Sequence, residues 1–204
     1  AIVALDAAQL TALSDEQLAA LTTAQVRAIE VADLQALPNA DLAVLTSAQI
    51  AALTSQQFVG LTAGQIAAID ATDLQGVSTA VLVQMTTTQV QALTPAQVTA
   101  LSAGQLNALS STQINALTAG QVAAIDTADI AALTTAKVAA LSTDQVAALT
   151  TEQFTSLANG QLAALASHQL TALDTAELNS LSSAQFQALS SRQIGSLANH
   201  QLST

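Results

Sequence analysis

The chain has 204 residues, of which 51% are hydrophobic and 8% are charged, and its aromatic residues are Phe58, Phe154 and Phe186. Fourteen acidic and three basic residues give a net charge of −11. This charge excludes nucleic acids and anionic lipid surfaces as partners, because binding to either requires Lys and Arg. Cysteine is absent, so disulfides and thiol chemistry are excluded, and no apolar run is long enough for membrane insertion.

An eight-residue repeat, or octad, fills the chain from Leu5 onward. Position 1 is Leu, Ile, Val or Met in all 25 octads, and position 6 is Leu, Ile, Val or Phe. Position 5 is Gln in 18 octads, and position 8 is usually Ala. The register has no insertion or deletion, so we expect residues 1–204 to form a single continuous array without linkers. We interpret this array as a segment of a longer chain.

The period of eight is incompatible with one long helix. An α-helix advances about 100° per residue, so eight residues overshoot two turns by about 80° and an apolar stripe would wind around the helix. Ala and Gln favour helix over strand. We therefore expect an all-α solenoid, or superhelix, of very short N-capped helices, with one helix per octad. A β-solenoid is the alternative. The period does not determine the number of octads per superhelical turn or its handedness.

Position 2 supplies the expected start of each helix. It is Ser, Thr or Asp in 20 of the 25 octads, and Gln or an acid usually follows three residues later, which is the spacing of a capping box. Thr22–Gln25, Thr46–Gln49 and Thr150–Gln153 follow this pattern, and Thr134–Lys137 is a variant of it. No Gly recurs at the helix ends, so we expect extended N-cap residues and no left-handed Gly caps.

Some octads modify the capping pattern. Pro95 follows Thr94 and so occupies the first helical position, which proline favours. Where position 2 is Ala, the next residue is polar, so we expect the capping oxygen to move along by one residue. These changes run from Ala158, Ala166 and Ala198 to Asn159, Ser167 and Asn199.

Four octads carry acids at positions 2 and 5, as the pairs Glu30/Asp33, Asp70/Asp73, Asp126/Asp129 and Asp174/Glu177. We interpret each pair as a capping box in acidic form, which the helix dipole favours. The alternative is a set of Ca²⁺ ligands, because calcium binds several carboxylate oxygens. The candidates for that role are Asp70, Asp73, Asp126 and Asp129. No calcium-loop spacing accompanies them, so we expect neither a metal site nor a cofactor.

No catalytic motif accompanies the repeat. His168 and His200 both occupy position 4, without a Cys or a third His, so we expect solvent-facing side chains and not zinc ligands. No general base accompanies the many hydroxyl side chains, and phosphate-binding and dinucleotide-binding motifs are absent. We therefore predict that the protein is not an enzyme.

Hydroxyl side chains recur together near the expected helix starts, at Thr22-Thr23, Thr86-Thr87-Thr88, Thr134-Thr135, Ser182-Ser183 and Ser190-Ser191. Capping explains one hydroxyl in each group. The remaining hydroxyls form a possible ridge for binding ice, carbohydrate or a sister fibre, or for carrying O-glycans.

The octads LTSAQIAA (45–52), LTAGQVAA (117–124) and LSTDQVAA (141–148) resemble repeat tracts of very large secreted or surface proteins of Gram-negative bacteria, which are adhesin-like or filament-forming. The resemblance implies an extracellular or cell-surface location and a role as spacer or fibre. We expect a structural repeat protein that forms a segment of a fibre, stalk or filament and associates with itself end to end or laterally. The alternative is an adhesin or scaffold module that binds its ligand through the Ser/Thr ridge.

Overall fold

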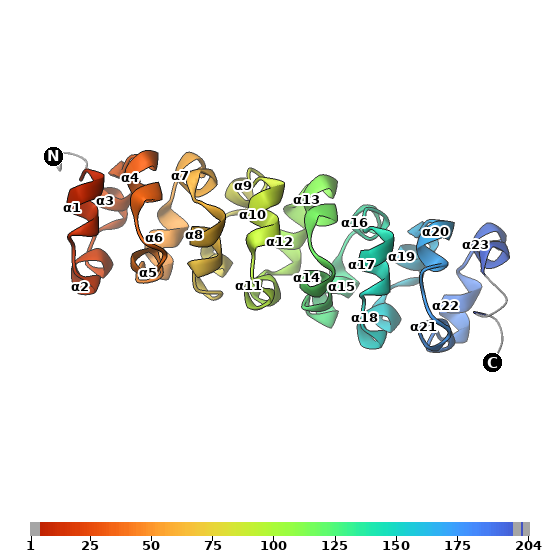
Figure 1. Cartoon of the computed structure of the whole chain (residues 1–204). Coiled ribbons are helices and arrows are strands. Elements are labelled where there is room, and N and C mark those ends of the chain that lie inside the picture. The colour runs from red at the N-terminus through yellow and green to blue at the C-terminus, as the bar shows by residue number, and fades with distance from the viewer. Residues whose placement is uncertain (1–4, 198–200, 202–204) are drawn as a thin grey trace. The chain divides into compact units, whose positions relative to one another are not determined.

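The computed structural model describes residues 5–197 and residue 201, which form short helices and, within these ranges, no strand. The prediction of an all-α array with one short helix per octad is confirmed, and the β-solenoid alternative is wrong. The chain forms two compact units, Ala1–Ala108 and Leu109–Thr204, and each is described by itself. Figure 1 shows the short helices of each unit joined by brief extended segments.

The helices of the first unit are α1 (Ala7–Thr11), α2 (Asp15–Ala19), α3 (Thr23–Ala28), α4 (Val31–Ala36), α5 (Asn39–Leu42), α6 (Ser47–Ala52), α7 (Ser55–Gly60), α8 (Ala63–Ala68), the 3₁₀ helix η1 (Asp73–Gly76), α9 (Thr79–Leu82), α10 (Thr87–Ala92), α11 (Pro95–Ala100) and α12 (Ala103–Ala108). Those of the second unit are α13 (Ser111–Ala116), α14 (Ala119–Ala123), α15 (Thr127–Ala132), α16 (Thr135–Ala139), α17 (Thr143–Ala147), α18 (Thr151–Ser156), α19 (Asn159–Ala164), α20 (Ser167–Leu170), α21 (Thr175–Asn179), α22 (Ser183–Gln187) and α23 (Ser191–Ser196).

Extended residues separate consecutive helices. Leu53 ends α6 with φ −55° and ψ 135°, and Thr54 begins α7 with φ −68° and ψ 159°. No described residue, glycine included, has a positive φ. The expected extended N-cap is therefore confirmed where position 2 begins an α-helix. The exception is η1, whose N-cap residue, Thr72 at position 4, is helical with φ −67° and ψ −27°.

Capping boxes form where Ser or Thr at position 2 meets Gln at position 5, as predicted at Thr22, Thr46 and Thr150. The Thr134 variant forms half of the box: its hydroxyl accepts from the Lys137 amide, but the lysine side chain cannot accept a hydrogen bond in return. Pro95 occupies the first turn of α11, as predicted.

The prediction that the cap moves along where position 2 is Ala is wrong at Ala158 and Ala166. Both remain the N-cap residue, in extended conformation and without a side-chain cap bond. The Gln161 side chain still accepts from the Ala158 amide at 2.7 Å, so half of the box persists and the helix start does not shift. The third case, Ala198 with Asn199, lies outside the described residues.

Three of the four acidic capping boxes were predicted wrongly. Asp174 and Glu177 form the full box, but Glu30 and Asp126 make no side-chain cap bond. Asp70 instead accepts from the amide and hydroxyl of Thr72, both at 3.0 Å. The failing octads carry Asp at position 5, at Asp33, Asp73 and Asp129. Its side chain is one methylene shorter than that of Gln or Glu, so it does not reach back to complete the reciprocal bonds. The second carboxylate is not the cause, because Asp174 and Glu177 form the full box with two.

Within each unit the array coils so that helices three octads apart pack together. In the first unit α1 contacts α4, α3 contacts α6, and α4 contacts α7; in the second, α15 contacts α18 and α20 contacts α23. Side chains at position 7 reinforce this packing, because Arg27 Nε donates to the Ala52 carbonyl and Asn115 Nδ2 donates to that of Ala140. The repeating contact partner therefore lies 24 residues away.

Positions 6 and 1 build the core of each unit. Position 6 is fully buried in most octads, and Phe58 and Phe154 are its largest members. Position 1 is also buried in nearly all of the described octads, Leu53 and Leu61 among them. Because isolated helices of five or six residues are unstable in water, burial of these aliphatic side chains between successive turns is what makes the helices stable.

Gly60 marks a close approach between neighbouring turns, and it supports a test of this packing. A methyl group on Gly60 would overlap Val31 Cγ1, whereas one on Gly120 would meet no atom within 4 Å. We expect Gly60→Ala to destabilise the fold by about 1–2 kcal/mol, because the β-branched Val31 side chain cannot easily rotate away. Gly120→Ala should instead stabilise it by about 0.5–1 kcal/mol. Urea unfolding of both variants measures whether the two changes in the free energy of unfolding have opposite signs. Changes of the same sign would contradict the close packing at Gly60.

Candidate functional site: the glutamine ladder

The glutamines at position 5 form the most regular polar feature of the structure. Their side-chain oxygens accept from the position 2 amide of the same octad, for example at 2.7 Å from Thr46 to Gln49 and at 2.8 Å from Thr94 to Gln97. This is the local half of the interaction, and it holds the amide group of each glutamine in a fixed orientation.

The same amide groups donate to the preceding superhelical turn. Gln97 Nε2 lies 2.7 Å from the Ile66 carbonyl and 2.7 Å from that of Ile69, which are 31 and 28 residues earlier. Gln57 makes the equivalent bonds to Val26 and Ile29, both at 2.8 Å. We name this series the glutamine ladder; within the units it comprises Gln49, Gln57, Gln65, Gln89, Gln97, Gln105, Gln145, Gln153, Gln161, Gln169, Gln185, Gln193 and Gln201.

The ladder solves a problem that the octad creates. Every interrupted helix leaves carbonyl groups without intrahelical partners. The acceptors of the ladder are the position 6 carbonyl near a helix end and the extended position 1 carbonyl that follows it. Among the described residues, no buried side-chain polar atom lacks a hydrogen-bond partner.

The spacing of these interactions gives the length of one superhelical turn. Within each unit, helices contact the helix three octads away, and the ladder glutamines donate to carbonyls up to four octads earlier. One superhelical turn therefore takes between three and four octads.

Sequence reasoning assigned these glutamines to local capping alone and missed the ladder. A signal for it was present, since a capping box accepts Glu as readily as Gln, yet position 5 holds Gln in 18 octads and Glu only at Glu177. Only Gln combines the acceptor that capping needs with the two N–H donors that the carbonyls need.

Other residues at position 5 mark interruptions of the ladder. Lys137 still provides a donor in place of the glutamine amide, because its Nζ donates to the Leu109 carbonyl 28 residues earlier. Asp73 is buried and accepts from the Ser47 hydroxyl. Glu177 is half-buried and caps Asp174, and burial, followed by the nearby Asp174 charge, raises its pKa despite the hydrogen bond from the Asp174 amide. An ionised carboxylate has no hydrogen to donate, so these acids cannot make the ladder bonds.

Glu177→Gln should therefore repair one interruption. By the ladder spacing, the new amide would donate to the carbonyls of Val146 and Leu149, 31 and 28 residues earlier. We expect a gain of about 1 kcal/mol in the free energy of unfolding at neutral pH. The gain should shrink in acid: the raised pKa means that folded Glu177 keeps its proton longer than unfolded Glu177, so the wild-type fold loses stability as pH rises through that range. Unfolding curves at pH 4 and pH 7 measure this difference.

Two of the candidate calcium ligands, Asp70 and Asp73, bind separate partners. The Asp70 carboxylate is exposed, and the bonds from the backbone amide and then the hydroxyl of Thr72 lower its pKa. Asp73, three residues later, is buried against Ser47. Asp126 is exposed and Asp129 is half-buried. Across residues 5–197 and 201, no three His, Cys, Asp or Glu side chains lie close enough together to hold a metal ion.

The second hydroxyls of the Ser/Thr groups lie at the surface. Thr23, Thr87, Thr135, Ser183 and Ser191 are all exposed, while their neighbours at position 2 cap the helices. His168 is exposed as predicted, and His200 lies outside the described residues. In each unit these hydroxyls are therefore accessible to a ligand or to a second copy of the chain.

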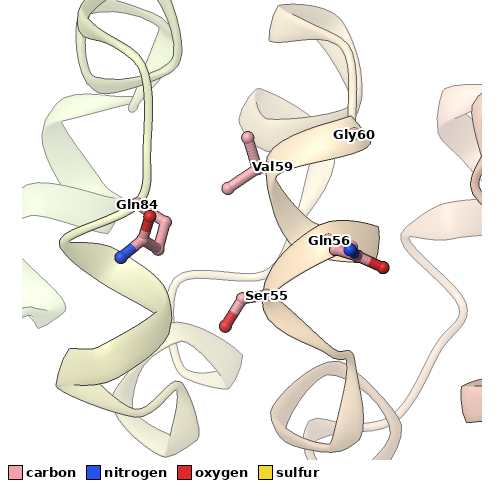
Figure 2. Close-up of a pocket in the computed structure, with 5 residues that line it drawn as sticks. All are labelled: Ser55, Gln56, Val59, Gly60 and Gln84. Carbon is pink, nitrogen blue, oxygen red and sulfur yellow. The ribbon is translucent and has the colours of Figure 1, made fainter.

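An open groove of about 560 Å³ lies between α7 and the segment that follows α9. In Figure 2, Ser55 and Val59 point toward Gln84, and Gly60 lies at the end of α7. The lining residues Ser55, Gln56, Val59, Gly60 and Gln84 include no ionisable group, so this groove holds no acid, base or activated nucleophile. Within the described part of the chain, no helix has the length and apolarity required to cross a bilayer.

Comparison with known proteins identifies a repeat family. A family model described as the ALTTAQ repeat matches the chain four times, at residues 26–63, 66–103, 122–159 and 162–199. Together the matches cover most of the chain. No curated protein matches the sequence. An all-helical fold built from a tandem repeat indicates a structural protein.

Proposed function

Because this chain belongs to the ALTTAQ repeat family, we propose that it is a structural repeat protein that forms a segment of an extracellular fibre, stalk or filament. The glutamine ladder is the observation that carries the proposal. Within each unit its buried hydrogen bonds tie a superhelical turn to the preceding one wherever position 5 is Gln, so these octads meet equivalent partners. An array of this kind lengthens without limit and without a change of contacts.

We include self-association, end to end or lateral, in this proposal. Its support is that the octads repeat the same kind of exposed side chain along each unit, such as the hydroxyls of Thr23 and Thr87 in the first. The low share of charged residues, 8%, and the abundance of Ser and Thr are the grounds for placing the protein outside the cell or at its surface.

Length measurement tests the structural role. We would join one, two and four copies of the array in register and measure their maximum dimensions by small-angle X-ray scattering. A spacer should lengthen in proportion to the number of octads. A maximum dimension that grows only as the cube root of the mass would overturn the proposal. Electron micrographs of the single array at increasing concentration test filament formation separately.

The exposed hydroxyl ridge supports a second candidate, an adhesin or scaffold module. Thr87 and Thr88 of the first unit are exposed and take no part in helix capping. A carbohydrate array probed with the chain distinguishes this candidate from a pure spacer. Replacing these exposed threonines with Val should abolish binding to the array if the ridge is the binding surface.

A further inference from the structure

One groove of the second unit gathers basic side chains from an otherwise acidic chain. It has a volume of about 480 Å³, and its lining includes His168, Arg192 and Ser167. His168 and Arg192 occupy position 4 of octads that lie three apart, and the packing of α20 against α23 brings these octads together. The superhelix therefore places two cationic or hydrogen-donating side chains at one site, although they are 24 residues apart in sequence.

Among the described residues, no other side chain or backbone group of the fold pairs with the Arg192 charge in this groove. The other basic residues serve the backbone, since Arg27 donates to the Ala52 carbonyl and Lys137 to the Leu109 carbonyl. Arg192 is exposed and makes no hydrogen bond or ion pair to the described part of the chain. No acidic residue lines the groove. The grooves beside Gly60, Thr22 and Phe186 are lined by no charged residue at all.

We propose that the His168–Arg192 groove binds a carboxylate-bearing saccharide, such as an oligomer of a uronic acid. The planar guanidinium of Arg192 suits bidentate binding of a carboxylate. The imidazole of His168 and the hydroxyl of Ser167 can hydrogen-bond sugar hydroxyls. Ala163 and Ala166 provide apolar surface for the C–H face of a sugar ring. The volume falls within the range of small-molecule sites, about 300–1,000 Å³.

This inference goes beyond the structural role and does not rest on it. A chain can form filaments without binding the acidic sugar, and it can bind the sugar without forming filaments. The length measurements can therefore contradict the structural role without affecting the binding proposal, and the binding experiment can contradict the binding proposal without affecting the structural role. The groove also differs from the hydroxyl ridge, because its recognition depends on charge and not on regularly spaced Thr side chains.

Nuclear magnetic resonance of the ¹⁵N-labelled chain, titrated with α-1,4-linked trigalacturonate, tests the site. We expect saturable shifts of the Ser167, His168 and Arg192 amides. Arg192→Gln should weaken binding by about tenfold or more, as expected for the loss of one bidentate ion pair. Arg27→Gln, which changes the charge equally in the other unit, should leave the affinity unchanged. Both altered side chains are exposed, and an otherwise unchanged spectrum verifies that each variant is folded.

Several outcomes would overturn the proposal. Equal affinity for the neutral trisaccharide maltotriose would show that the carboxylates are not recognised. Unchanged binding by Arg192→Gln, or saturable shifts confined to other parts of the chain, would remove the groove from the interaction. Tighter binding of a polyglutamate peptide than of trigalacturonate would assign the groove to an acidic protein partner in place of a sugar.

Discussion

Gln97→Glu should lower the free energy of unfolding by about 3–5 kcal/mol at neutral pH, because it places a charge beside two buried carbonyls. Gln97 is 0% exposed, and its Nε2 donates at 2.7 Å to each of Ile66 and Ile69. Glutamate has the same size and keeps the capping acceptor for the Thr94 amide, so the substitution replaces the ladder donors with a charge and leaves the capping bond in place. Urea unfolding followed by far-ultraviolet circular dichroism measures the loss, and hydrogen exchange over residues 61–105 locates it.

Gln17→Glu is the matched control. Gln17 forms the same capping box with Ser14, but it is exposed and its amide group donates to no carbonyl of the described chain. This variant should change stability by less than about 0.5 kcal/mol, because glutamate suits a capping box. Equal losses for the two variants would mean that position 5 acts through capping only, and the ladder would then contribute nothing.

Acid should reverse much of the Gln97→Glu defect. Burial raises the pKa of a carboxyl group, so the folded variant would hold its proton at a pH where the unfolded chain has lost it. Its stability relative to wild type should therefore recover as pH falls and decline as pH rises. A protonated carboxyl donates one of the two missing hydrogen bonds. A defect that is independent of pH would contradict this explanation.

Phe154→Ala should cost about 3–5 kcal/mol, the usual range for removing a buried aromatic side chain. Phe154 occupies position 6 of its octad and is fully buried. Loss of the ring would leave a cavity between turns that thin aliphatic layers cannot fill. Phe154→Leu should cost less than about 1.5 kcal/mol, because Leu fills position 6 in many other octads and the volume changes little.

Phe186 provides the comparison in the same unit. It occupies position 6 as well, but it is half-buried, so Phe186→Ala should cost clearly less than Phe154→Ala because less apolar area is lost. Chemical denaturation of the three variants measures the loss in the free energy of unfolding for each, and so gives the order of these losses. A larger loss at Phe186 than at Phe154 would contradict the burial that the structure assigns to these two positions.

The octad by itself determined the local structure. Helix starts at Thr22, Thr46 and Thr150 and proline at the first position of α11 followed from interactions within eight or nine residues. Side-chain length explains why three of the predicted acidic capping boxes do not form. Asp at position 5 is too short for a capping box, and this could have been recognised from the residue type before the fold was known.

The tertiary structure alone decided how the octads meet. The second role of Gln97, the packing of α20 against α23 and the pairing of Arg192 with His168 in one groove all join residues 24 to 31 positions apart. A period of eight fixes which face of each short helix is apolar, but not how many helices complete a turn. That number depends on small bends at the extended residues between helices, which accumulate over three to four octads. The strict choice of Gln over Glu at position 5 was the one trace of this long-range contact in the sequence.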